Sequence, residues 1–352
     1  MKSAPFHLGF SKGDRRNDTP QDIAWEENFT GSHFPKRKSR GNACCIITPM
    51  SETATPDFLG IGAPRAGTTW LWTTLRAHPQ IWMPPRKELH FFDRPGKYPT
   101  ARHLQHEHLA TRMFRFDRSG RKWWRVLGTD IYYLMTGRNK FSEIPWLLRY
   151  HFSRVNDPWY LSLFEGHAGM VRGEITPAYC LLDDEDVKHV HSLLPNVKLL
   201  YTLRDPVERA WSQIRFGMGR RGLMVNEDAL AEIERRAGTL SQNLTGDYLG
   251  TLKRWMTYYP QEKMFILFQD QIEEDPESLV RNVYQFLGVD ASFQPPSGLL
   301  RRKVNASAES DMPPAVRDLL VKKFAPMVRE LNEMIGGYTA KWLDGYKKQG
   351  WF

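Results

Sequence analysis

The stretch DFLGIGAPRAGTT, residues 57–69, joins a short apolar run to a glycine-containing loop and to the start of a helical pattern. The apolar run is short and ends at Gly62, which predicts a buried strand. Residues 68–77 place apolar side chains on one face of a helix. Between a strand and a helix N-terminus, backbone amides converge on an anion. We therefore predict a phosphate-binding loop at residues 62–69.

ATP-binding loops follow the pattern G-x-x-x-x-G-K-[ST], in which the lysine reaches the β- and γ-phosphates and the final hydroxyl holds Mg²⁺. Gly62, Gly67 and Thr69 match this pattern, but Thr68 stands where the lysine should be. The loss of that lysine argues against a triphosphate ligand. A cation is present inside the loop instead, as Arg65. The loop therefore suits a nucleotide with one 5′-phosphate and a further small anionic group attached to it.

Outward from this loop, buried-strand patterns alternate with helical patterns. Further strands are predicted at residues 171–176, 197–203 and 263–268. Helices are predicted at residues 184–194, 206–218, 226–236, 245–259, 275–288 and 313–335. Strands that alternate with helices imply a mainly parallel sheet with helices on both faces. The predicted fold class is a single-domain α/β fold of the P-loop type.

A second phosphate-binding candidate is LRDPVERAWS, residues 203–212, again between a strand and a helix. Arg204 ends the strand, at the edge where ligands of open α/β sheets bind. Ser212 lies on the following helix, where both side chains could reach one phosphate. An arginine at a strand end can equally pair with Asp205 or with a helix end, so this segment alone leaves both alternatives open.

Two titratable side chains follow the loop in KELHFFD, residues 87–93. If this segment were extended, Glu88 and His90 would share one face and Phe91 would pack inward. A carboxylate and an imidazole beside a phosphate loop could serve as a base and its proton partner. The alternative is a surface strand with solvated charges.

Composition favours an anionic partner without identifying it. The 352 residues carry a formal net charge of +9, which suits nucleotides, acidic glycans, nucleic acid or lipid headgroups, and equally a solvated basic surface. The three cysteines, Cys44, Cys45 and Cys180, lack metal-type spacing and fit a reducing compartment. There is no N-terminal apolar segment and no run of about 18 apolar residues. We expect a cytoplasmic protein with no secretion signal, membrane span or metal.

The chain is expected to divide into three regions. Residues 1–54 are rich in small, polar and charged residues, with KRKSR at 36–40, and predict a disordered basic arm. Residues 55–340 are expected to form the domain. Residues 341–352 are expected to form a C-terminal tail.

Residues 94–170 are the least regular part of the predicted domain. They are rich in Arg, His, Trp and Tyr and include RKWWR at 121–125. Long connections of this kind are often functional loops. We therefore predict an acceptor-side insertion in which Trp123 and Trp124 bind the acceptor, although both tryptophans could equally belong to the core.

Together these stretches resemble the sulfotransferases that use 3′-phosphoadenosine 5′-phosphosulfate (PAPS), particularly the branch with heparan sulfate sulfotransferases and bacterial relatives. The resemblance runs in order from Phe58 to about Gly336. GAPRAGTTWL is similar to the family's 5′-phosphosulfate loop, LRDPVERAWS to its 3′-phosphate motif, and KELHFFD to the stretch that supplies a catalytic glutamate. LLRRKVNAS, from residue 299, is similar to the late loop that closes over the nucleotide. GEITPAY at 173–179 and GDYLGTLKRWMTYYP at 246–260 are further family-like stretches.

The resemblance implies in-line transfer of a sulfonate group from PAPS to a hydroxyl or amine of a glycan, lipid or small alcohol, without a metal. Glu88 would take the acceptor's proton, with His90 as the competing candidate, and Arg65 and the loop amides would stabilise the leaving phosphate. The other residues implied to bind the donor are Pro64, Ala66, Gly67, Thr68, Thr69, Trp70, Arg204, Ser212, Arg301, Arg302 and Lys303. Lys87 joins the two tryptophans as a predicted substrate-binding residue.

Arg65 departs from the family pattern, which usually has a lysine at this position. Arginine keeps the positive charge, but its guanidinium is planar and does not give up its proton under ordinary conditions. It can still stabilise the departing phosphate electrostatically. A role of Arg65 in protonating the bridging oxygen is in doubt.

Two other classes of function remain open from the sequence. A P-loop kinase or ATPase is disfavoured by Thr68 and by the lack of an obvious Mg²⁺-binding acidic residue that ends an apolar strand. It would bind ATP only with Mg²⁺, whereas a sulfotransferase would bind adenosine 3′,5′-bisphosphate without metal. A nucleic-acid-binding protein would rest on KRKSR and RKWWR alone, with no recognised module, and we expect no nucleic-acid partner.

Overall fold

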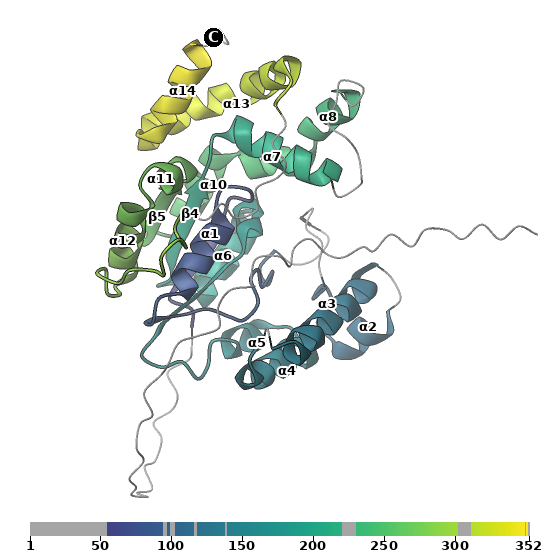
Figure 1. Ribbon diagram of the computed structural model, residues 1–352. Helices are drawn as coiled ribbons and strands as arrows, with labels where there is room; N and C mark the ends of the chain where they lie inside the picture. Colours follow the sequence, from purple (N-terminus) through teal and green to yellow (C-terminus); the bar gives the residue numbers. More distant parts are fainter. Residues whose placement is uncertain are drawn as a thin grey trace, which may run out of the picture. The chain divides into compact units, whose positions relative to one another are not determined.

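The computed structural model of the chain describes residues 55–93, 97–98, 103–115, 118–137, 139–219, 230–301, 311–348 and 350. These residues contain a five-stranded sheet (Figure 1). Its strands are β1 (Phe58–Gly62), β2 (Ile81–Trp82), β3 (Val171–Ile175), β4 (Lys198–Leu203) and β5 (Met264–Phe268). The strand order is β2-β3-β1-β4-β5, and every neighbouring pair is parallel. The predicted α/β class with a parallel sheet is confirmed.

The helices described in the chain surround this sheet and extend beyond it. Those before β4 are α1 (Thr68–Arg76), α2 (Leu109–Phe114), α3 (Arg118–Met135), α4 (Ile144–Phe152), α5 (Asp157–Ser162) and α6 (Asp184–Leu193). Those after β4 are α7 (Pro206–Gly219), α8 (Leu230–Ala237), α9 (Leu240–Gly246), α10 (Tyr248–Met256), α11 (Gln269–Glu274), α12 (Pro276–Leu287), α13 (Pro314–Ile335) and α14 (Tyr338–Lys348). None of these helices is both long enough and apolar enough to cross a membrane.

Strand β1 lies at the centre of the sheet and is buried along its whole length. Such continuous apolar runs occur where helices cover both faces of a parallel sheet. The chain passes from β1 through α1 to β2 in one direction, and from β3 through α6 to β4 in the other. Right-handed crossovers place these two helices on opposite faces. The carboxyl end of β1 is therefore at a crevice where ligands of such sheets bind.

Most predicted elements are present at the predicted places. The four predicted strands agree with β1, β3, β4 and β5 to within about one residue at each end. Helices α6, α7, α10, α12 and α13 match their predicted segments. The predicted helix at 226–236 is seen as α8 from Leu230, and residues 226–229 lie outside the described residues, as do residues 1–54.

The expectation of an irregular connection at 94–170 is wrong for much of that segment, which contains α2 to α5. Helix α3 carried a local signal that the prediction did not use. Trp123, Leu127 and Leu134 recur at helical spacing, and all three lie in or pack against the hydrophobic core. The buried face also carries Asp130, whose carboxylate binds Arg86.

The predicted C-terminal tail from residue 341 is also helical as far as Lys348. Helix α14 packs on α13 and buries Trp342, Leu343 and Tyr346. These side chains belong to the same hydrophobic core cluster as Leu59 of β1. The domain therefore extends beyond the predicted boundary at residue 340.

Candidate active site

The predicted phosphate loop lies between the carboxyl end of β1 and the first turn of α1. Helix α1 begins after Gly67, whose φ is 91°, and no described side chain caps its N-terminus. The first amides of a helix have no intrahelical acceptor, so they remain available to an anion. The φ of 91° at Gly67 is a backbone conformation that residues with side chains rarely adopt, which favours glycine here. The predicted loop residues Pro64, Arg65, Ala66, Gly67, Thr68, Thr69 and Trp70 all lie in this short segment.

The two predicted phosphate motifs contact each other through Arg65 and Ser212. The Nε atom of Arg65 donates to Oγ of Ser212 on α7 at 3.3 Å. The guanidinium carbon lies 4.4 Å from the ring centroid of Phe216, one turn further along the same helix. Arg65 has a φ of 70°, which is uncommon for a residue with a side chain. The loop backbone therefore directs this cation toward the middle of α7.

Arg204 follows β4, next to the strand that leads into the phosphate loop. Its carbonyl oxygen accepts from the Tyr248 hydroxyl at 2.8 Å. The neighbouring Asp205 accepts from the Val207 amide at 2.8 Å and from the Tyr346 hydroxyl at 2.6 Å. Burial raises the pKa of Asp205 to about 6. The Asp205 carboxylate is thus held by an amide and a tyrosine hydroxyl, and no ion pair with Arg204 is present in the described part of the chain.

The KELHFFD segment does not adopt the extended backbone in which Glu88 and His90 would share one face, because both residues have left-handed backbones with φ of 65° and 55°. Their side chains nevertheless meet, with 3.5 Å between Oε2 of Glu88 and Nε2 of His90. The Nδ1 atom of His90 lies 2.9 Å from the fully buried carboxylate of Asp93. These three side chains therefore form a continuous Glu–His–Asp chain that starts beside the phosphate loop.

Lys87 connects this chain to the phosphate loop. Its ammonium donates to the Thr69 hydroxyl at 2.8 Å and lies 3.1 Å from Oε1 of Glu88. Lys87 was predicted to bind the substrate, and the structure places it against the first turn of α1. The Glu88 side chain keeps 37% of its surface exposed. A second molecule can therefore approach this carboxylate from the solvent.

Charge around Glu88 and His90 determines which of the two is free to accept a proton at neutral pH. Burial alone would raise the pKa of Glu88, but Lys87 and His90 lower it to about 2. Burial alone would lower the pKa of His90, but Asp93 and Glu88 raise it to about 10. At neutral pH the carboxylate is ionised and can accept a proton, whereas the imidazole is protonated and cannot.

This arrangement predicts a specific pH dependence of turnover. From about pH 6 to about pH 9, kcat/KM for an acceptor that does not titrate in that range should stay level, because Glu88 is already ionised and His90 is still protonated. If His90 were the base, its deprotonation would be required, and kcat/KM would rise steadily toward pH 10. Initial rates of the wild-type protein across this range distinguish the two.

The two tryptophans predicted to bind the acceptor have different environments. Trp123 is fully buried and packs edge-on against His151 and Phe152 of α4, so it belongs to the core and presents no surface to an acceptor. Trp124 is 48% exposed, and its indole nitrogen donates to the Met113 carbonyl. An acceptor-binding role stays a prediction for Trp124 alone.

Replacing Trp124 with alanine should raise the acceptor KM by about 2- to 10-fold, the loss of one aromatic contact of ~0.5–1.5 kcal/mol. The affinity for adenosine 3′,5′-bisphosphate should stay nearly unchanged, because α3 is not part of the phosphate loop. Steady-state kinetics together with melting curves test this. An unchanged KM in a variant that melts at lower temperature would identify Trp124 as a structural residue.

The late segment predicted to close over the nucleotide is only partly described. Leu300 reaches the phosphate loop, since its carbonyl accepts from the Trp70 indole nitrogen at 2.9 Å. The Arg301 guanidinium pairs with Glu277 of α12 at 3.0 Å and is 77% exposed. The two other residues predicted in this segment, Arg302 and Lys303, lie outside the described residues.

Four groups at this site were not predicted from the sequence. Tyr248 and Tyr346 hold the Arg204–Asp205 turn, Phe216 faces Arg65, and Asp93 supports His90. Only Asp93 had a local signal, because it lies three residues after His90 in KELHFFD. The other three come from α7, α10 and α14, and only the folded chain brings them together.

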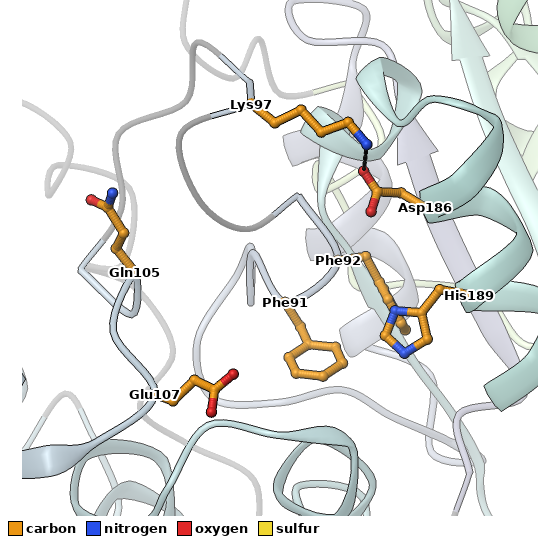
Figure 2. A pocket seen from close by; sticks show the side chains of 7 residues that line it. All are labelled: Phe91, Phe92, Lys97, Gln105, Glu107, Asp186 and His189. Atoms are coloured by element: carbon orange, nitrogen blue, oxygen red, sulfur yellow. Dashed lines mark hydrogen bonds and ion pairs between the residues drawn. The ribbon is translucent and has the colours of Figure 1, made fainter.

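A pocket of about 270 Å³ lies behind the KELHFFD segment (Figure 2). Figure 2 shows Phe91 and Phe92 at one side of it and the ion pair of Lys97 and Asp186 at another. Its other lining residues are Gln105, Glu107 and His189. Glu88 and His90 do not line this pocket, so it is separate from the side chains assigned to proton transfer.

The sequence of this chain is similar to those of known sulfotransferases. A sequence profile described as "Sulfotransferase family" matches residues 56–294. The chain is 21% identical over 329 residues to carbohydrate sulfotransferase 15 of Homo sapiens, with 82% of this chain and 54% of that protein covered. It is 22% identical over 285 residues to heparan sulfate glucosamine 3-O-sulfotransferase 3A1 of Homo sapiens, with 77% and 56% covered. The chain thus spans about half the length of these two curated relatives.

Among solved structures, a sulfotransferase from Alicyclobacillus acidocaldarius superposes with a TM-score of 0.57 and 23% sequence identity. The superposition covers 82% of this chain and 99% of that one. At this identity the likeness concerns the fold, and it agrees with the parallel sheet described above.

Proposed function

This chain belongs to the sulfotransferase family, and from that premise we propose that it transfers a sulfonate group from PAPS to a hydroxyl or amine of an acceptor. The observation that supports this most strongly is the contact between Arg65 and Ser212. It brings together the two motifs that the family resemblance assigns to the 5′-phosphosulfate and the 3′-phosphate. A glycan acceptor is the leading proposal, because both curated relatives named above are carbohydrate or heparan sulfate sulfotransferases by name.

The residues present fit a nucleotide with phosphate groups at both ends of its ribose. The uncapped N-terminus of α1, with Arg65 and Lys87 beside it, would hold the 5′-phosphosulfate. Arg204 and Ser212 would hold the 3′-phosphate through charge-assisted and hydroxyl contacts. PAPS would supply an activated sulfonate on a phosphate leaving group.

In the proposed reaction Glu88 takes the proton from the acceptor as the acceptor oxygen or nitrogen attacks sulfur. The new bond to sulfur forms while the bond from sulfur to the bridging phosphate oxygen breaks, and its electron pair leaves with the phosphate. Arg65, Lys87 and the loop amides stabilise that developing charge. Unlike the Arg65 guanidinium, the Lys87 ammonium carries a proton that it can transfer, so it is placed to assist the leaving oxygen that the family lysine would serve.

Transfer from labelled PAPS to a panel of acceptors, with mass spectrometric identification of the products, tests this proposal. Glycans, lipids and small alcohols should be included, with adenosine 3′,5′-bisphosphate measured as the second product. Binding of that bisphosphate should not require Mg²⁺. Mg²⁺-dependent binding of ATP, together with no transfer from PAPS, would instead favour a P-loop kinase or ATPase.

A further inference from the structure

The GEITPAY segment places a buried carboxylate beneath the Glu88–His90 turn. Glu174 of β3 is 2% exposed. Its Oε1 atom accepts from the hydroxyls of Tyr160 and Tyr179 at 2.9 and 2.8 Å. Its Oε2 atom accepts from the Thr176 hydroxyl at 2.6 Å and from the Leu89 amide at 3.4 Å. An ionised carboxylate has about four acceptor sites, so four donors satisfy it without a cation among them.

The same network accepts hydrogen bonds from three consecutive backbone amides of the KELHFFD segment. Besides the Leu89 amide at Glu174, the His90 amide donates to Oγ1 of Thr176 at 3.5 Å. The Phe91 amide donates to the Tyr179 hydroxyl at 3.2 Å. The hydroxyls of Thr176 and Tyr179 each donate to Glu174 and accept an amide of the turn. Glu174 is therefore the common acceptor that links these two hydroxyls to the turn.

These hydrogen bonds hold a turn that contains two residues with left-handed backbones. Glu88 and His90 have φ of 65° and 55°, and such backbones persist only where surrounding structure determines them. The amides of Leu89, His90 and Phe91 follow or belong to these two residues. Anchoring them fixes the direction in which the Glu88 and His90 side chains leave the backbone.

We propose that Glu174 is a positioning residue, which holds the proposed base Glu88 in its left-handed turn through Thr176 and Tyr179. The assignment of Glu88 rests on the proposed function, whereas the anchoring of the turn does not. Burial raises the pKa of Glu174, and the four hydrogen bonds that the carboxylate accepts oppose that rise. In Glu174→Gln the side chain keeps its size, but its NH2 group cannot accept a hydrogen bond, so two of the four donors lose their acceptor in either orientation of the amide.

Two tyrosines provide a matched pair for the test. Tyr160 and Tyr179 are both fully buried, and each donates to the same oxygen of Glu174. Only Tyr179 also receives an amide of the turn. Tyr179→Phe and Tyr160→Phe therefore each remove one hydroxyl that donates to Glu174, but only Tyr179→Phe also removes an acceptor of the Phe91 amide. This pair keeps the test decisive even if Glu174→Gln folds poorly.

Hydrogen exchange of the amides at 89–91, read by mass spectrometry or NMR, is the first measurement. Tyr179→Phe and Glu174→Gln should increase exchange by about 10-fold or more, whereas Tyr160→Phe should leave it near the wild-type rate. The second measurement is the split between kcat and binding. Tyr179→Phe and Glu174→Gln should lower kcat by about 10- to 100-fold, as misplaced catalytic groups do, with bisphosphate affinity unchanged.

Equal exchange in the two tyrosine variants would overturn the proposal, as would a fall in kcat that merely follows the loss of folded protein. If amide exchange is faster in Tyr179→Phe but the wild-type protein transfers no sulfonate, the anchoring of the turn is supported and the proposed function is overturned instead. The two failures are therefore distinguishable.

Discussion

Glu88→Gln should lower kcat by about 10²- to 10⁴-fold, the usual effect of losing a general base. A hydroxyl is a poor nucleophile until its proton is removed, so the carboxylate matters for turnover much more than for binding. Glutamine keeps the size and hydrogen-bonding capacity of the side chain but not its basicity. Affinity for adenosine 3′,5′-bisphosphate should be almost intact, because Glu88 is assigned to the acceptor side of the reaction.

Steady-state kinetics and calorimetry on two further variants complete this test. Glu165→Gln removes a carboxylate that pairs with Arg149 at the surface and should leave kcat unchanged. His90→Asn removes the imidazole that lies between Glu88 and Asp93. If Glu88→Gln keeps most of its kcat while His90→Asn loses it, His90 is the base and the assignment to Glu88 is wrong.

Arg204→Ala should weaken the binding of adenosine 3′,5′-bisphosphate by about 10- to 150-fold, the loss of one charge-assisted contact of about 1.5–3 kcal/mol. The effect follows from the place of Arg204 at the carboxyl end of β4, beside the phosphate loop. Ser212→Ala should have a smaller effect, since it removes a neutral hydroxyl. Both losses of affinity should be smaller when binding is measured with an analogue that lacks the 3′-phosphate.

Arg317→Ala is the matched control for this measurement. Arg317 pairs with Glu208 on α7, the same helix that carries Ser212, at 3.0 Å. The substitution removes one positive charge nearby and leaves the residues predicted to bind phosphate unchanged. Isothermal calorimetry that finds wild-type affinity in Arg204→Ala, or an equal loss in Arg317→Ala, would contradict the assignment of the 3′-phosphate site.

The elements predicted correctly from the sequence are those whose structure follows from residues close together in the chain. Strands β1 and β4 are apolar because both faces of the sheet are covered, so their patterns predict them directly. The loop that follows β1 and the turn that follows β4 are fixed by those strands, which is why Arg65 and Ser212 could be named in advance. Their roles in binding remain predictions.

The conformation of the Glu88–His90 turn could not be predicted in the same way. Left-handed backbone at residues with side chains has no local sequence signal, and here the amides of His90 and Phe91 donate to hydroxyls of Thr176 and Tyr179, which lie far away in the sequence. The helical state of α3, by contrast, had a local signal, because Trp123, Leu127 and Leu134 recur at helical spacing and face the core.

The left-handed backbones at Arg65, Glu88 and His90 set stability against activity. Each costs on the order of 1–3 kcal/mol of folding free energy, and glycine would adopt the same backbone without that cost. At each position the chain keeps the costly residue, and with it a charged or titratable side chain. A screen for heat resistance alone would therefore accept glycine at Arg65 and Glu88, where a screen for turnover would reject it. At His90 glycine would also remove a partner of the buried Asp93 carboxylate, and both screens would reject it.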